Sequence, residues 1–153
     1  LVTSAYGIGS VCASFDATGA TPVWQGVESL ASQYATPVLV GGRLYAFDGR
    51  DDVPPADLVC LEPETGRVLW RERGFGYGTL LVADGMMLAA KTDGEILLVR
   101  PDPTRLDVVA RARPFADDRQ GGPLRALPAL AGGRLYLRND RTLVALDVGP
   151  DAR

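Results

Sequence analysis

The stretch Asp48-Gly49-Arg50-Asp51-Asp52 gathers carboxylate oxygens in one short segment and is the first candidate for chemistry. Calcium ions prefer oxygen ligands, so a calcium loop is the site that such a segment could support. The stretch lacks the alternating ligand spacing and the final glutamate of an EF-hand. The run Val53-Pro54-Pro55 follows it directly. We therefore interpret it as a solvated loop between two strands and expect no metal ion there.

Other reactive side chains are few. The sequence contains no histidine, which removes the usual general base and the commonest metal ligand. Its two cysteines, Cys12 and Cys60, are too few for a disulfide framework and lack the paired spacing of a zinc site. We expect both to be buried small hydrophobic side chains. Accordingly, we assign no catalytic, metal-binding or cofactor-binding residue.

Two glycine-rich segments, 6–9 and 74–78, are similar in composition to phosphate-binding loops. A dinucleotide fingerprint requires a helix after the glycines, and residues 79–85 are typical of a strand instead. We interpret both segments as connections between elements. Exposed aromatic and arginine side chains near such connections are candidates for contact with a ligand or partner. These candidates are Tyr6, Tyr34, Phe75, Tyr77, Arg119 and Arg125.

Composition narrows the class of protein. The chain is 46% hydrophobic and 23% charged, which predicts a folded protein. Its net charge is −3, and arginines alternate with acidic residues, so no basic stripe is present for nucleic acid. No apolar run approaches the roughly 20 residues of a membrane-spanning helix. We expect neither a nucleic-acid partner nor a transmembrane segment.

Three segments, beginning at Pro37, Leu80 and Pro128, share one pattern of apolar residues, a two-residue turn and further apolar residues. The pattern predicts β-hairpins with type I′ turns, which need positive φ at both central positions. The predicted turns are Gly41-Gly42, Asp84-Gly85 and Gly132-Gly133. They recur at intervals of roughly 45 residues, which is close to one four-stranded propeller blade per repeat.

Further strands follow each hairpin, and with strands named a to d the chain gives the order bcd, abcd, abcd, abc. The predicted fold is therefore all-β, a partial β-propeller of about three and a half four-stranded antiparallel blades over residues 1–153. The blade boundaries are predicted at 1–26, 34–73, 77–113 and 123–148. Propellers usually have 4–8 blades. We expect either the C-terminal part of a longer protein or a short chain that self-associates through open blade edges.

A second repeat lies in the turns between the third and fourth strands. Residues 60–70 read CLEPETGRVLW, and an altered copy ends at Trp24. Glycine permits the turn, the threonine and acid can bond turn amides, and the indole can cover the seam between blades. A third copy, from Leu98, has lost both the Thr-Gly pair and the tryptophan. The proposed structural docking residues are Asp16, Thr18, Gly19, Trp24, Glu62, Thr65, Gly66 and Trp70.

This motif resembles the tryptophan-docking repeat of quinoprotein-like, or PQQ-repeat, propellers. That family includes PQQ-dependent alcohol dehydrogenases and the non-catalytic outer-membrane assembly factor BamB. Cys60 stands where the family pattern has alanine. The order of segments in nearly the whole chain resembles the C-terminal part of bacterial PQQ-repeat proteins.

The resemblance implies a non-catalytic binding or scaffold module of a periplasmic or cell-envelope propeller protein. Its partner would be another protein or the remaining blades of the same propeller, and no cofactor is expected in this chain. Two alternatives remain open. One is the C-terminal half of a PQQ- and Ca²⁺-dependent alcohol or sugar dehydrogenase, whose cofactors would depend mainly on other blades. The other is recognition of a carbohydrate or polymer.

Overall fold

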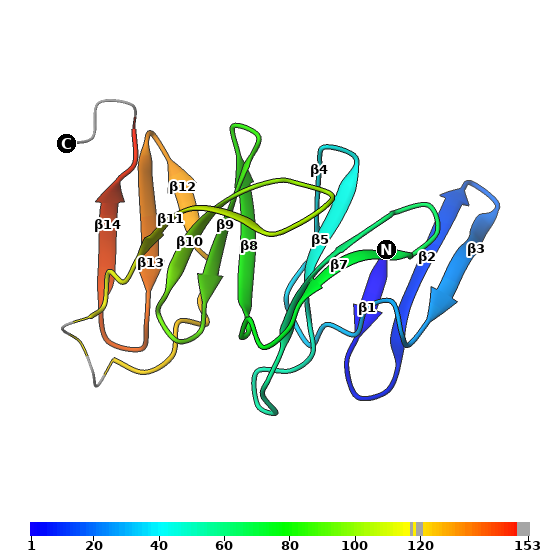
Figure 1. Cartoon of the computed structure of the whole chain (residues 1–153), viewed down its shortest axis with the longest axis horizontal. Helices are drawn as coiled ribbons and strands as arrows, with labels where there is room; N and C mark the ends of the chain where they lie inside the picture. Colours follow the sequence, from blue (N-terminus) through cyan, green and yellow to red (C-terminus); the bar gives the residue numbers. More distant parts are fainter. Residues whose placement is uncertain (117, 119–120, 150–153) are drawn as a thin grey trace.

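The computed structural model describes residues 1–116, 118 and 121–149. In this part of the chain every regular element is a β-strand, and fourteen strands form four antiparallel sheets. Figure 1 shows the sheets side by side, from the first at the N-terminus to the fourth near the C-terminus. No helix that could span a membrane is found among the described residues.

Each sheet is built from strands that are consecutive in the chain. The first sheet contains β1 (Val2–Ser4), β2 (Gly9–Asp16) and β3 (Gly19–Gly26). The second contains β4 (Val38–Val40), β5 (Arg43–Asp48), β6 (Asp57–Leu61) and β7 (Val68–Glu72). The third contains β8 (Gly78–Ala83), β9 (Met86–Lys91), β10 (Ile96–Arg100) and β11 (Asp107–Ala112). The fourth contains β12 (Ala129–Ala131), β13 (Arg134–Arg138) and β14 (Leu143–Asp147).

This arrangement confirms the predicted all-β fold class and the partial propeller of three- and four-stranded sheets. The two middle sheets have four strands, and the two outer sheets have three. The residue boundaries of the blades themselves stay predictions.

The hairpin turns lie between the first two strands of the second, third and fourth sheets. Each turn has two central residues, because Val40 pairs with Arg43 and the other two hairpins have the same register. All six central residues have positive φ, as type I′ turns require. Asp84, the one central residue that is not glycine, has φ of +48°. Aspartate tolerates this region better than most residues, which explains its place there.

A β-bulge occurs at the same place in each of the first three sheets. The register shifts between the last two strands of each, at Cys12/Ala13, Cys60/Leu61 and Leu98/Val99. A bulge adds one unpaired residue and re-aims the side chains beside it. In the first two sheets the residue after the bulge is a tryptophan: Trp24 pairs with Cys12 and Trp70 with Cys60. In the third sheet the same position is Ala110, which pairs with Leu98.

Each tryptophan contacts a turn of the next sheet. Trp24 Nε1 donates to the carbonyl oxygen of Pro63 at 2.8 Å, and Trp70 Nε1 donates to that of Asp102 at 2.8 Å. A Cβ on Gly66 would lie 2.7 Å from the Trp24 ring, and Gly66 has φ of +70°. Only glycine therefore fits at this point, for two independent reasons.

The turns that receive the indoles are closed by side-chain hydrogen bonds. Thr65 Oγ1 donates to Glu62 at 3.0 Å, and the guanidinium of Arg67 also binds that carboxylate. In the third sheet, Thr104 donates from its backbone N and from Oγ1 to Asp102 Oδ1, at 2.7 and 2.6 Å. Asp16 and Thr18 form the same pair in the first sheet. The third copy has thus lost the Thr-Gly sequence but keeps an Asp-Thr closed turn.

The hydrophobic core fills the spaces between sheets. The cluster between the second and third sheets contains Tyr45, Phe47 and Cys60 from one and Met87 and Leu97 from the other. Smaller clusters lie beside the second sheet and between the third and fourth sheets.

The expectation of buried cysteines is correct for Cys60 and wrong for Cys12, which is only half-buried. The reason is the strand pairing on one side of each cysteine. In the second sheet, Tyr45 of the neighbouring strand lies opposite Cys60. In the first sheet, the β1–β2 ladder ends at the pair Val2 and Val11, one residue before Cys12. No strand residue therefore covers Cys12 from that side.

Replacing Trp70 by alanine is expected to lower the free energy of unfolding by about 3 kcal/mol, as for other large truncations in a core. The change removes the indole from Tyr45, whose ring centroid lies 5.9 Å away, and the hydrogen bond to Asp102. Urea denaturation measures the effect. Phe15→Ala is the control, because Phe15 is 85% exposed and its loss should change stability by about 0.5 kcal/mol or less. Equal stability of the Trp70 variant and the wild type would contradict this role of the indole.

Candidate functional site

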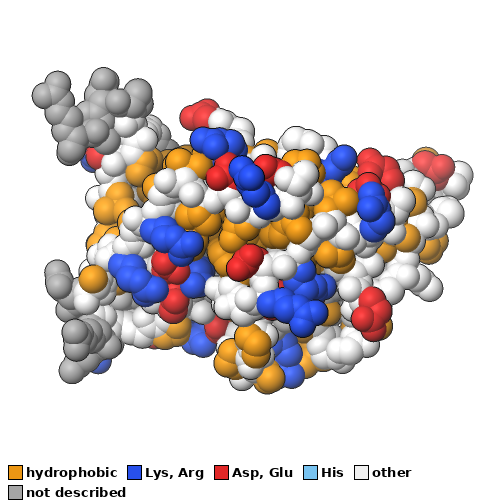
Figure 2. Space-filling view, in the orientation of Figure 1, with side chains coloured by type: hydrophobic (Ala, Val, Ile, Leu, Met, Phe, Trp, Pro, Cys, Tyr) orange, Lys and Arg blue, Asp and Glu red, His pale blue; other side chains and the backbone are white. Residues whose placement is uncertain are grey.

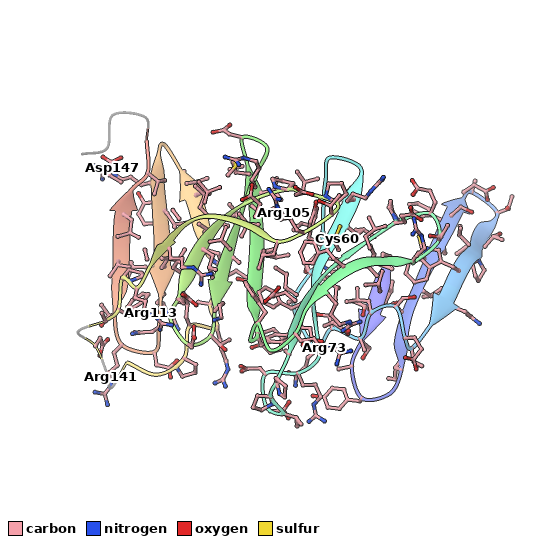
Figure 3. All side chains as sticks on the ribbon, viewed as in Figure 1. Cys60, Arg73, Arg105, Arg113, Arg141 and Asp147 are labelled. Carbon is pink, nitrogen blue, oxygen red and sulfur yellow. The ribbon has the colours of Figure 1, made fainter. Side chains whose placement is uncertain are left out.

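The connections between sheets meet at one end of the strands, which we call the loop face. It carries the three connections between sheets, β3–β4, β7–β8 and β11–β12, along the lower edge of Figure 1. The β1–β2, β5–β6, β9–β10 and β13–β14 connections within sheets lie along the same edge. Figure 3 places Arg73, Arg113 and Arg141 along this edge, and Arg105 and Asp147 along the opposite edge. Loops held by a rigid scaffold are where binding residues gather. The loop face is therefore the first place to look for a site.

Asp51 is the centre of a polar network on the loop face. Its Oδ1 accepts a hydrogen bond from Thr92 Oγ1 at 2.9 Å, and its Oδ2 accepts one from Arg125 Nε at 2.8 Å. Its backbone N donates to Gln33 Oε1 at 2.9 Å. The side chain is only 11% exposed. One carboxylate thus joins connections that belong to different sheets.

The environment of Asp51 favours its charged form. Burial alone raises the pKa of this carboxyl group, but hydrogen bonds from Arg125 and Thr92 and the charge of Arg125 outweigh it. The pKa of Asp51 therefore lies below its ordinary value of 3.8. Nearby, burial and then the negative charge of Asp51 raise the pKa of Tyr34 to about 12, so this phenol stays protonated at neutral pH.

Tyr6 and Arg50 form the second part of the network. The Arg50 guanidinium lies 4.3 Å from the centre of the Tyr6 ring, a cation–π contact. Gln33 Nε2 donates to the Tyr6 hydroxyl at 2.6 Å and to Asp52 Oδ1 at 3.1 Å, and Arg50 also binds Asp52. Tyr6 nevertheless remains 60% exposed. Its ring is held in place while most of its surface is available to a partner.

The carboxylates of the acidic stretch 48–52 bind donors of the protein itself. Asp48 accepts from the backbone N of Ala31 and binds Arg71, while Asp51 and Asp52 bind the donors described above. Among the described residues no group of three or more acidic or cysteine side chains is placed to hold a metal ion. The stretch is also less solvated than expected, because Asp51 is mostly buried.

Tyr77 lies beneath the loop face and supports it. Its hydroxyl accepts hydrogen bonds from the backbone N of Tyr34 at 2.8 Å and of Ala35 at 2.9 Å. Ser32 Oγ lies 3.3 Å from the same hydroxyl. Tyr77 is only 4% exposed, and its ring meets that of Tyr34 edge-on at 4.8 Å. It holds the 32–35 segment in its conformation.

The predicted contact residues therefore separate into two groups. Tyr6, Tyr34 and Arg125 come together around the Asp51 loop, and Tyr34 is 46% exposed. The interpretation of Tyr77 as a surface contact is wrong, because its ring is buried in the core. Phe75 is half-buried between Phe47 and the Lys91 ammonium, so it belongs to the same support. Arg119 lies outside the described residues.

Gln33 and Thr92 are the members of this site that the sequence did not single out, and Asp51 was considered only as part of a calcium loop. Asp51 and Arg125 are 74 residues apart in the chain, and Asp51 and Thr92 are 41 apart. No local spacing signals contacts at such separations. In Figure 2 positive and negative side chains alternate over the visible face, in agreement with the absence of a basic stripe from the sequence.

The docking and hairpin residues lie away from this network. The turns at Gly41-Gly42, Asp84-Gly85 and Gly132-Gly133 and the indole-receiving turns are at the opposite end of the strands, along the upper edge of Figure 1. Tight turns and indole contacts therefore occupy one end of the strands, and the polar network around Asp51 occupies the other.

Comparison with known families and structures agrees with this architecture. The sequence profile of the family described as outer membrane protein assembly factor BamB matches residues 8–148. Among solved structures, BamB from Moraxella catarrhalis is similar with a TM-score of 0.63 and 17% identity, over 89% of this chain and 39% of that chain. Comparison with curated protein sequences gives no match.

Two enzymes share the fold as well. The quinohemoprotein alcohol dehydrogenase ADHIIG from Pseudomonas putida HK5 has a TM-score of 0.55 and 17% identity, over 77% of this chain and 19% of that chain. A europium-containing methanol dehydrogenase has a TM-score of 0.52 and 16% identity, over 76% and 23%. At such identities the likeness concerns the fold alone. The chain spans less than half the length of each of these structures.

Replacing Tyr77 by phenylalanine is expected to lower the free energy of unfolding by about 2 kcal/mol, because two backbone N–H groups lose their acceptor. Tyr136→Phe is the matched control, since no hydrogen bond of the Tyr136 hydroxyl occurs among the described residues. Hydrogen exchange should show faster exchange of the Tyr34 and Ala35 amides in the Tyr77 variant only. Unchanged exchange at both amides would argue against the support that we describe.

Asp51 should make stability depend on pH in acid. Its pKa is lowered by folding, so its contribution is fully present above the ordinary value near 3.8 and is lost as the pH falls through the lower folded-state value. Urea denaturation between pH 2 and pH 7 should therefore give a flatter stability profile below about pH 4 for Asp51→Asn than for the wild type. Glu28→Gln, a change at an exposed carboxylate, is the control. Parallel profiles of the Asp51 variant and the wild type would refute this linkage.

Proposed function

The chain belongs to the family described as outer membrane protein assembly factor BamB, and on this premise we propose that it is a non-catalytic binding module of an extracytoplasmic PQQ-repeat propeller protein. In this proposal the sheets are a scaffold, Trp24 and Trp70 dock the first three sheets to one another, and the loop face binds a partner protein. The location at the cell envelope follows from the family and is part of the proposal.

The observation that carries the proposal is the network around Asp51. It orders connections from several sheets into one surface and leaves Tyr6, Tyr34 and Arg125 accessible on it. Tyrosine and arginine are enriched at the energetic centres of protein interfaces. A tyrosine ring that is already fixed by Arg50 and Gln33 loses little conformational entropy when a partner covers it.

The chemistry of the loop face also suggests what kind of partner it takes. The acid at its centre is neutralised by Arg125, and Arg50 and Asp52 pair with each other, so the surface is polar and nearly balanced in charge. A partner that offers hydrogen-bonding groups and apolar surface for the tyrosine rings would match it. A strongly charged polymer would not.

Site-specific photo-crosslinking tests the proposal in the full-length protein that carries this chain. A photoreactive phenylalanine in place of Tyr6 or Tyr34 should give a covalent adduct with a specific envelope protein, identified by mass spectrometry. The same residue in place of Phe15 is the control, because Phe15 is exposed but lies outside the loop face. Addition of Asp51→Ala should reduce the Tyr34 adduct severalfold, since the loop then loses its central anchor.

Adducts at Phe15 alone, or none at any position, would exclude the loop face as the binding surface. The enzymatic alternative is examined with the same full-length protein. Incubated with PQQ and Ca²⁺ and then with alcohols or sugars, it should not reduce an artificial electron-acceptor dye. Dye reduction that depends on both PQQ and substrate would replace the scaffold proposal with the dehydrogenase.

A further inference from the structure

A groove lies between the third and fourth sheets, at the position where the preceding sheets carry tryptophans. Its volume is about 340 Å³, within the range of roughly 300–1,000 Å³ that is typical of ligand pockets. Its lining is mainly apolar and comes from both sheets. The lining residues used below are Leu88, Leu98, Ala110, Leu135, Leu146 and Val148.

The register of the strands shows that this groove corresponds to the tryptophan positions. Ala110 follows the bulge in β11 and pairs with Leu98, as Trp70 pairs with Cys60. Leu98 pairs in turn with Leu88, as Cys60 pairs with Tyr45. The frame of the indole position is thus conserved between the second and third sheets, and only the indole is replaced by a methyl group.

The fourth sheet supplies the opposite wall, as each following sheet does for the two tryptophans. Ala145 pairs with Tyr136 in the way that Cys60 pairs with Tyr45 and Leu98 with Leu88. Counted from these pairs, the carbonyl that corresponds to Pro63 is that of Val148, and the carbonyl that corresponds to Asp102 is that of Gly149. Trp24 donates to the Pro63 carbonyl at 2.8 Å. Val148 lines the groove. A backbone carbonyl of Val148 or Gly149 is therefore the acceptor that an indole in this groove would meet.

We propose that this groove binds the side chain of a tryptophan that a partner protein supplies. The chain itself contains the two precedents for such an occupant, with the same bulge, the same apolar surroundings and the same kind of acceptor. A second copy of the chain does not provide this side chain, because its only tryptophans, Trp24 and Trp70, already serve its own sheets.

The chemistry of the groove favours an indole over an aliphatic side chain. A large aromatic surface gains most from leaving water, and the indole N–H can donate to the turn carbonyl as it is buried. A leucine would fill part of the volume but has no group that can donate to a carbonyl there. Ala110 is exposed in the groove, which agrees with an entrance open to solvent.

This inference is independent of the proposed function. The groove lies in the seam between two sheets, and none of its lining residues belongs to the Asp51 network. A loop face without a partner would leave the groove unaffected, and a groove that binds nothing would leave the loop face unaffected. The crosslinking experiment on the loop face and the binding experiment on the groove can therefore fail independently of each other.

The test uses the whole chain and the probe N-acetyl-5-fluorotryptophanamide, followed by ¹⁹F NMR. The wild type is expected to bind the probe, and Ala110→Trp to weaken binding at least tenfold, because its own indole fills the groove. Val109→Trp is the matched control: it adds the same indole to the same strand at a 45% exposed position outside the groove lining, and should bind as the wild type does. N-acetylleucinamide should compete at least tenfold less well than N-acetyltryptophanamide.

Thermal unfolding of the same variants gives a second measurement. The melting temperature of Ala110→Trp should rise by several degrees above that of the wild type, since the added indole meets a preformed site, whereas that of Val109→Trp should not. The proposal is overturned if the wild type does not bind the probe, if Ala110→Trp binds it as tightly as the wild type, or if Ala110→Trp lowers the melting temperature.

Discussion

The hydrogen bond from an indole of one sheet to a turn carbonyl of the next joins the first sheet to the second and the second to the third. An antiparallel sheet of three or four strands is a poor fold by itself, because both faces and two edges remain exposed. Trp24 and Trp70 add both apolar surface and a directional bond at the seam. The bond is directional, so it also restricts the position of the turn relative to the indole.

The bulge before each tryptophan explains how a strand directs the indole toward the next sheet. In an uninterrupted ladder, side chains alternate strictly between the two faces. The extra residue at Val23 or Leu69 breaks that alternation and re-aims the tryptophan. The third sheet keeps the bulge at Val109 but carries alanine after it. The third sheet therefore has the bulge without the indole that the bulge presents in the other two sheets.

How much the sequence predicts depends on how local the interaction is. The glycine turns, the fourteen strands and the seam position of Trp70 follow from patterns within one repeat, and these describe the fold. The Asp102–Thr104 turn was missed because its residue types and spacing differ from those of the motif, although the same kind of threonine-to-carboxylate hydrogen bond closes it. The Asp51–Arg125 pair could not be predicted, because its partners lie 74 residues apart in loops without a repeat. The prediction that Tyr77 lies at the surface was wrong. Its glycine-rich neighbours are typical of an exposed loop, but its ring packs into the core.

The two ends of the strands divide structure and recognition between them. At one end, indoles and tight turns hold the sheets at fixed distances. At the other end, Asp51 reaches Thr92 and Arg125 only if those distances are kept, since hydrogen bonds of 2.8 and 2.9 Å tolerate little displacement. Tyr77 connects the packed core to the loop face. Its ring belongs to the core between sheets, and its hydroxyl fixes the backbone of Tyr34. Order on the loop face is therefore a consequence of packing at the seams.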